Sequence, residues 1–120
     1  MKIVIATFNE GKFKEFKDLF SNSSFEILSL KDFTTEDIDE TGSSYEENAM
    51  LKAKKASELS NFPSLGDDSG LEVKLLNNDP GLLSARYSGK NATDEKNIKK
   101  LLKATKNLEN TKAKFVSTLA

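Results

Sequence analysis

The sequence predicts an α/β protein in a single domain, because short β-branched segments alternate with amphipathic helical segments along its 120 residues. Residues 2–7 form an apolar run rich in β-branched side chains, which is typical of a buried strand. Asn9 is expected to cap the helix that follows. The apolar side chains of this helix fall on one face: Phe13, Phe16, Leu19 and Phe20.

The middle of the chain predicts a second strand and a second helix. Residues 25–30 alternate enough to form a strand, and an acidic, irregular stretch follows up to Glu40. A helix is expected from about residue 45 to 59, with Ser44 and Glu47 in a capping box. Its narrow apolar face consists of small side chains, which would let it lie close to a sheet: Ala49, Ala53 and Ala56.

The remaining elements follow in order: short strand 64–66, strand 71–76, turn 77–81, irregular segment 82–89, a helix capped by Thr93, and strand 114–119. The last strand is expected to be central in the sheet, so it needs a neighbour on each side. We therefore expect the chain to represent an incomplete domain. We also expect it to associate through that strand, and a cooperatively melting monomer would contradict this.

Composition excludes several kinds of chemistry. Apolar residues make up 37% of the chain and charged residues 31%, with a net charge of −1. This balance favours neither non-specific nucleic-acid binding nor membrane binding. The chain has no cysteine and no histidine, which excludes thiolate or imidazole metal sites and Ser-His-Asp catalysis within it. With no stretch long enough to cross a membrane, a cytoplasmic location is expected.

Residues 7–12 lie between a predicted strand and a predicted helix. A helix N-terminus presents free backbone N–H groups and the positive end of the helix dipole, which suits phosphate. Gly11 would allow a close approach of ligand to backbone, and Lys12 would add a positive charge. The alternative is an ordinary strand-to-helix turn with a surface lysine.

Two further segments carry acidic side chains. Glu40 precedes the helix on which Asn48 and Lys52 share a face, so the three could hold a metal and a phosphate, or form a solvated surface. Asp67 and Asp68 stand between glycines after a short strand, where adjacent carboxylates repel unless a cation or donors compensate. Their side chains are expected to point to opposite sides and to have different roles. The alternative is an Asp-rich turn.

A fourth segment, residues 84–89, contains Arg86 and Tyr87. Arginine recognises phosphate and tyrosine can stack on a base, so the segment could be a binding loop. It could equally be a structural crossing, and its position alone does not decide between these.

Together, these segments resemble one family in order and spacing. Residues 6–12 are similar to its A-T-x-N-x-x-K signature, and residues 40–42 with 47–53 to its E-T-G … E-N-A … K-A segment. Residues 66–71 resemble its A-D-D-S-G-L loop, and residues 80–89 its P-G … S-A-R-Y-S-G stretch. The chain is therefore identified as similar to the inosine/xanthosine triphosphate pyrophosphatases.

The resemblance implies a mixed central sheet flanked by helices, and hydrolysis of ITP, dITP and XTP to the monophosphate and pyrophosphate. It also implies Mg²⁺ as cofactor and a homodimer. Glu40 and Asp68 would bind the metal, and Asp68 would also be the base for the attacking water. Lys12 and Lys52 would neutralise phosphate charge in catalysis. The remaining substrate contacts would come from these residues: Thr7, Phe8, Asn9, Glu10, Gly11 and Ser69.

The resemblance has two departures and one gap. Phe8 replaces a small residue and is expected to crowd its loop, whereas Gly66 replaces a common alanine and is expected to be harmless. The family's later G-F-G-Y-D-P and S-H-R motifs, which contact the base, are not among these residues. Three hypotheses follow: part of an active enzyme, a non-catalytic remnant that binds Mg²⁺, phosphate or a partner, or a hydrolase for other modified nucleotides. Roles for Asp67 and Arg86 stay open.

Overall fold

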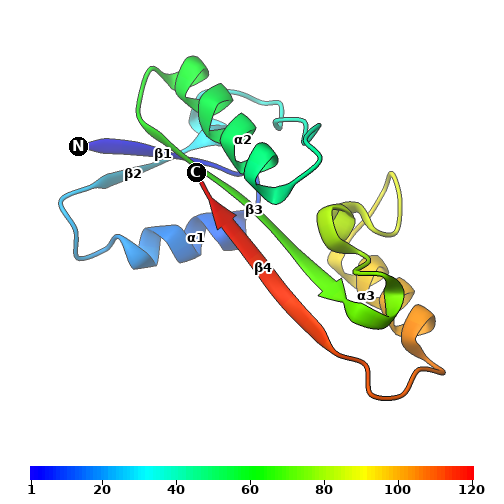
Figure 1. Ribbon diagram of the computed structural model, residues 1–120. Helices are drawn as coiled ribbons and strands as arrows, with labels where there is room; N and C mark the ends of the chain where they lie inside the picture. Colours follow the sequence, from blue (N-terminus) through cyan, green and yellow to red (C-terminus); the bar gives the residue numbers. More distant parts are fainter. The chain divides into compact units, whose positions relative to one another are not determined.

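The computed structural model describes all 120 residues, which form two compact units (Figure 1). The first unit is Met1–Asp68 with Thr118–Ala120, and the second is Ser69–Ser117. The prediction of one domain is not tested by this division. The main elements in chain order are β1 (Lys2–Ala6), α1 (Glu10–Leu19), β2 (Glu26–Ser29), α2 (Tyr45–Ser60), β3 (Ser64–Val73), α3 (Asp94–Thr105) and β4 (Ala113–Leu119).

The strands form one sheet in the order β2-β1-β3-β4. Strand β1 is parallel to both of its neighbours, with Ile5 opposite Ser29 on β2 and Ala6 opposite Gly66 on β3. Gly66 and Ala120 exchange both backbone hydrogen bonds, at 2.8 and 2.9 Å, which is the pattern of an antiparallel pair. The sheet is therefore mixed, as predicted. Among these residues β4 stands at the end of this order with one neighbour, so the prediction that it is a central strand is not tested.

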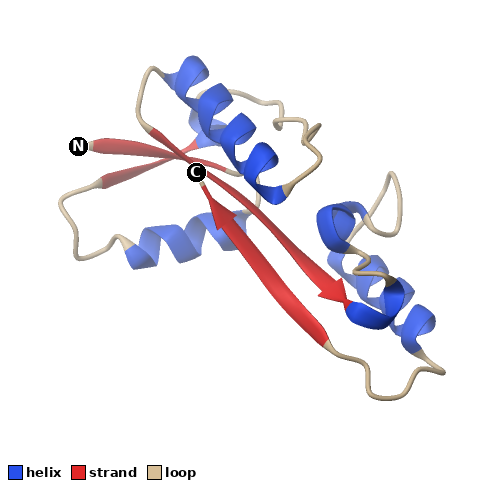
Figure 2. Ribbon diagram, in the orientation of Figure 1, coloured by secondary structure: helices blue, strands red, loops and turns tan.

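In the first unit, α1 and α2 lie on opposite sides of β1 and β2 (Figure 2). Strands β2 and β3 lie on either side of β1, so the connections from β1 to β2 and from β2 to β3 cross the sheet in opposite directions. Right-handed crossovers in opposite directions place their helices, here α1 and α2, on opposite faces. The buried core consists of Val4, Ala6, Leu30 and Ala56, against which Phe8 and other partly buried side chains pack.

Helix α2 lies unusually close to β3. A Cβ atom added to Gly66 would lie 2.0 Å from the carbonyl oxygen of Ala49 and 2.8 Å from the backbone nitrogen of Ala53. The small side chains predicted for this helix face, Ala49, Ala53 and Ala56, are all buried, as expected. Glycine in place of the common alanine at position 66 was expected to be harmless. It instead permits direct contact between the backbones of β3 and α2.

Strand β3 is longer than predicted. Residues 64–73 form one continuous strand, whereas two strands, 64–66 and 71–76, were expected, and the Asp-rich turn considered as an alternative for residues 67–70 is not formed. The strand ends in a 3-10 helix at Lys74–Leu76, and left-handed backbone conformations at Asn77 (φ 54°) and Asn78 (φ 67°) make the predicted turn. The sequence reading failed here because glycine and aspartate are rare in strands unless tertiary contacts hold them.

The second unit consists of the outer half of β3, most of β4, α3 and short 3-10 helices. The segment expected to be irregular contains one of these helices, Gly81–Arg86. Thr93 caps α3 through a hydrogen bond from the backbone N–H of Lys96, as predicted, but no side chain of α3 is buried. Across the chain, every helix is too short or too polar to cross a membrane.

We predict that Gly66→Val lowers the stability of the protein by about 1–3 kcal/mol, because the added methyl groups overlap the backbone of α2 and force the helix outward. Thermal and urea unfolding followed by circular dichroism measures this. Ala113→Val, at an exposed position of β4, is the matched control and should have little effect. Equal stability of the two variants would contradict the close contact.

Candidate functional site

The predicted site residues gather where the carboxyl ends of β1 and the first half of β3 lie side by side. Ala6 is opposite Gly66, so Thr7 and Asp67 are the next residues on two neighbouring parallel strands. Helix α1, which follows β1, and helix α2, which precedes β3, lie on opposite faces of the sheet. In open α/β sheets, ligands bind at the point where the connections change from one face to the other. The topology therefore selects this edge as the candidate site.

The segment after β1 is organised by its own side chains. Thr7 is buried, and its hydroxyl oxygen accepts a hydrogen bond of 3.1 Å from the backbone N–H of Asn9. The side-chain oxygen of Asn9 accepts one of 3.0 Å from the N–H of Lys12, so Asn9 caps α1 as predicted. A cavity of about 290 Å³ adjoins this loop and is lined by Thr7, Phe8, Asn9, Glu10, Phe13, Ser29 and Lys31.

Lys12 is paired with the first of the two adjacent aspartates. Its Nζ lies 2.5 Å from Oδ2 of Asp67, and the Asp67 side chain is almost fully buried. The pair joins the start of α1 to β3 across 55 positions of sequence. Asp67, whose role stays open in the sequence analysis, thus holds the ammonium of Lys12 beside the carboxyl end of β1.

A second lysine–carboxylate pair comes from α2. Lys52 is only 7% exposed, and its Nζ donates a hydrogen bond of 2.8 Å to Oε1 of Glu40. Burial of a lysine requires such a partner, because an unpaired ammonium in the interior is costly. The acidic segment before α2 is therefore anchored at Glu40, and the solvated surface considered from the sequence does not describe these two residues.

Asp68 is the third carboxylate of the site and is 3% exposed. Burial raises the pKa of Asp68 above its usual value, and the negative charge of Glu40 raises it further. The Asn48 amide and the ammonium groups of Lys52 and Lys12 act in the opposite direction, but burial outweighs them. All four of these residues thus lie close enough to Asp68 to affect its ionisation.

Asn48 and Asp68 are buried polar groups with incomplete hydrogen bonding. Oδ1 of Asn48 accepts a hydrogen bond of 2.7 Å from the backbone N–H of Gly42. Nδ2 of Asn48 and Oδ2 of Asp68 have no hydrogen-bond partner, although the amide is near enough to influence the carboxyl. A buried polar atom without a partner costs about 1–3 kcal/mol.

The charges of the site fit a divalent cation. Lys12 and Lys52 are each paired with one carboxylate, which leaves Asp68 outside any ion pair. No group of three or more acidic side chains lies close enough to hold a metal by itself. Glu40 and Asp68 nevertheless match the pattern for Mg²⁺, which proteins usually bind through one or two carboxylates together with substrate phosphates.

Four other predicted contact residues have structural surroundings of their own. Glu10 is exposed and accepts a hydrogen bond of 2.9 Å from Lys31, which lowers the pKa of Glu10. The ring of Phe8 packs on the core, and the expected crowding of its loop stays a prediction. An added Cβ on Gly11 would lie 3.2 Å from the capping oxygen of Asn9. Ser69 follows Asp68 on β3 and is half-buried.

The fourth segment considered from the sequence is tied to α3. The side-chain oxygen of Asn97 accepts hydrogen bonds from the backbone and hydroxyl of Ser88, and its Nδ2 donates to the carbonyls of Ser84 and Ala85. The ammonium of Lys100 lies 4.2 Å from the centre of the Tyr87 ring. These contacts favour a structural role for the segment over stacking of Tyr87 on a base.

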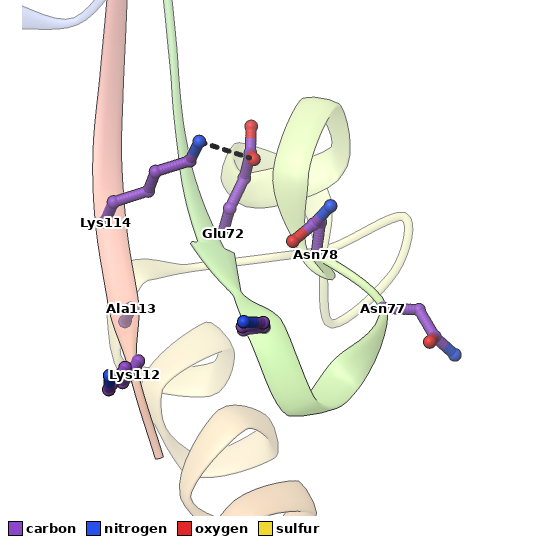
Figure 3. Close-up of a pocket in the computed structure, with 7 residues that line it drawn as sticks. Glu72, Asn77, Asn78, Lys112, Ala113 and Lys114 are labelled. Carbon is purple, nitrogen blue, oxygen red and sulfur yellow. Dashed lines mark ion pairs between the residues drawn. The ribbon is translucent and has the colours of Figure 1, made fainter.

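A larger cavity of about 590 Å³ lies in the second unit (Figure 3) and contains none of the predicted site residues. Its lining residues are Glu72, Lys74, Asn77, Asn78, Lys112, Ala113 and Lys114. Lys114 points towards Glu72, and their charged atoms are 3.8 Å apart. It is larger than the cavity beside Thr7, but its lining includes neither the buried carboxylates Glu40 and Asp68 nor the N-terminus of α1.

Sequence reasoning missed two features of the site. It did not predict that Asp67 pairs with Lys12, or that Gly42 fixes the amide of Asn48. The spacing of Asn48 and Lys52 on one helix face was the available signal for the second feature. The first could not be found from local sequence, because 55 positions separate the partners.

Comparison with known proteins shows the family of this chain. The family model described as Ham1 family matches residues 3–120. The chain belongs to the Ham1 family. Two curated relatives, both named dITP/XTP pyrophosphatase, come from Haemophilus influenzae (48% identical over 120 residues, 98% of this chain) and Oceanobacillus iheyensis (45% over 123 residues, 99% of this chain). The chain spans 62% of the length of each.

Solved Ham1 structures share the fold. A HAM1 protein from Coxiella burnetii superimposes with a TM-score of 0.85 and 38% identity, covering 100% of this chain and 62% of that protein. The Ham1 protein of Staphylococcus aureus gives a TM-score of 0.81 at 42% identity, covering 99% of this chain and 62% of the other. The mixed α/β fold predicted from the sequence is therefore confirmed by Ham1 relatives as well as by the strand order.

We predict that Asp68→Asn raises the melting temperature at neutral pH. Burial raises the pKa of Asp68 in the folded protein above its value in the unfolded chain. At a pH between these two pKa values, only the folded protein keeps the proton on Asp68. The stability of the folded protein therefore falls as the pH rises through this window. The amide removes this penalty. A gain of about 1 kcal/mol corresponds to roughly 4–8 °C in a domain of this size.

The measurement is thermal unfolding of both proteins in EDTA at acidic and neutral pH. The difference should disappear below the unfolded pKa of Asp68, where wild-type Asp68 is protonated in both states. Asp18→Asn, at an exposed position on α1, is the control for charge. A variant less stable than wild type at neutral pH would show that the Asp68 carboxylate is stabilised in the folded state.

Proposed function

We propose that this protein is a nucleoside triphosphate pyrophosphatase that hydrolyses ITP, dITP and XTP to the monophosphate and pyrophosphate. The observation that carries the proposal is the grouping of Lys12, Glu40, Lys52 and Asp68 beside the carboxyl end of β1 and the middle of β3. The Ham1 family match and relatives named dITP/XTP pyrophosphatase support the choice of substrate.

The triphosphate is expected to bind at the start of α1. The segment from Thr7 to Lys12 is already fixed by two hydrogen bonds, so little ordering is needed when a ligand binds. Lys12 and Lys52 then exchange part of their carboxylate contact for phosphate oxygens. Ammonium groups placed in this way neutralise the charge of the polyphosphate and hold it for attack.

Glu40 and Asp68 would hold Mg²⁺ together with phosphate oxygens. When bound, the ion would supply charge neutralisation at the phosphoryl group that is attacked. Asp68 would accept the proton of the attacking water, which adds to phosphorus as pyrophosphate leaves. Its raised pKa suits a general base better than an ordinary aspartate, because proton acceptance becomes more favourable as the pKa approaches the working pH.

The proposal also includes a homodimer, a cytoplasmic location and no nucleic-acid partner. The near-neutral net charge of −1 supports the absence of non-specific nucleic-acid binding. The absence of cysteine is compatible with a reducing compartment. Size-exclusion chromatography with light scattering tests the dimer directly.

We predict that the purified protein releases pyrophosphate from dITP and XTP in Mg²⁺, and that Asp68→Asn lowers kcat by about 10²–10⁴-fold through loss of the base. Glu40→Gln should raise the Mg²⁺ concentration needed for half-maximal rate. Asp18→Asn serves again as the control with the same chemical change at an exposed site.

The assay includes ATP and dTTP as competing substrates. Faster pyrophosphate release from dTTP than from dITP would favour the alternative function, hydrolysis of other modified nucleotides. Mg²⁺ and phosphate binding without turnover of any nucleotide would favour the non-catalytic alternative. Equal rates for wild type and Asp68→Asn on dITP would remove Asp68 from the mechanism.

A further inference from the structure

Asn48 is a fully buried amide that the proposed chemistry does not use. It lies on α2 one turn before Lys52, and both side chains are buried on the same side of the helix. Most buried amides on a helix satisfy both of their polar ends. Asn48 satisfies one end and leaves Nδ2 without a partner, which requires an explanation.

The backbone of Gly42 determines which way the amide faces. The N–H of Gly42 can only donate, so the atom of Asn48 that lies 2.7 Å from it must be the oxygen. An added Cβ on Gly42 would come within 2.6 Å of that oxygen, so glycine keeps the contact open. Nδ2, with its two donor hydrogens, is therefore directed away from Gly42.

The carboxyl of Asp68 is the group next to this donor. Oδ2 of Asp68 is buried and has no hydrogen-bond partner, and the two side chains are close enough to affect each other. Nδ2 of Asn48, a donor without an acceptor, thus lies next to the carboxyl of Asp68, whose Oδ2 is an acceptor without a donor. The two ammonium groups of the site are already paired with Glu40 and Asp67, so Asn48 is the neutral donor left to orient Asp68.

We propose that Asn48 is a positioning residue, which donates from Nδ2 to the Asp68 carboxylate and turns its other lone pairs towards the reacting groups. The expected effect of Asn48 on catalysis rests on the proposed function. The hydrogen bond between Asn48 and Asp68 does not depend on that function. Residues that orient a metal-binding or catalytic carboxylate in this way commonly affect activity by about 10–100-fold when replaced.

Asn48→Asp separates positioning from a purely structural role. The aspartate keeps the shape of the side chain and an oxygen for the Gly42 N–H, and replaces only the donor that faces Asp68. We expect kcat on dITP to fall about 10–100-fold, with KM changed by less than about threefold. Asn22→Asp, which makes the same change in the exposed segment after α1, is the matched control and should retain the wild-type rate.

A double-mutant cycle tests the pairing without any assay of activity. Melting temperatures are measured for wild type, Asn48→Asp, Asp68→Asn and the double variant, where both carboxylates ionise. Asn48→Asp should lower the melting temperature in the wild-type background, because two buried carboxylates then face each other. In the Asp68→Asn background most of this loss should vanish, because an amide again faces a carboxylate.

Each outcome decides one of the two proposals. Equal losses in both backgrounds would overturn the pairing of Asn48 with Asp68, even if the wild-type protein hydrolyses dITP. A wild-type protein that turns over no nucleotide overturns the proposed function, while the cycle still decides the pairing. If Asn48→Asp does not fold, folding of the double variant supports the pairing and failure of both overturns it. An unchanged kcat in a folded Asn48→Asp protein would show that Asn48 does not position Asp68 for catalysis.

Discussion

The contact between the backbone of α2 and β3 at Gly66 is the constraint on which the site depends. Because no side chain separates the two at this point, the helix lies close enough for Asn48 and Lys52 to reach the strand that carries Asp68. The small side chains of α2 serve the same purpose from the other side, since Ala49 and Ala56 are fully buried. The packing and the site are therefore coupled: a change that moves α2 outward also moves the Asn48 amide away from Asp68.

The charged groups of the site form two lysine–carboxylate pairs and one further carboxyl group, that of Asp68. Lys12 with Asp67, and Lys52 with Glu40, are compensated pairs that keep buried or half-buried lysines stable in the fold. Asp68 is held between them without a lysine of its own, and burial keeps its pKa raised. This arrangement gives the adjacent aspartates different surroundings, as their alternation along a strand implies.

Much of the fold followed from local pattern. The first strand, the Asn9 cap and the helix starting near residue 45 were predicted because periodicity and capping act over a few residues. The continuous strand through Asp67 and Asp68 was missed, because its extended backbone depends on partners far away in sequence. For the same reason the candidate residues could be named from their order along the chain, but the pairing of Lys12 with Asp67 and the orphaned atoms of Asn48 and Asp68 could not.

The salt bridge between Lys12 and Asp67 has a consequence for which ligands the site can retain. Any phosphate that engages Lys12 competes with a carboxylate 2.5 Å from the ammonium group, so binding is an exchange of anions. A ligand with several negative charges can contact both lysines at once and compete effectively, whereas a nucleoside monophosphate reaches fewer positive charges. On the proposed function, Asp67 would compete for Lys12 and favour release of the monophosphate product.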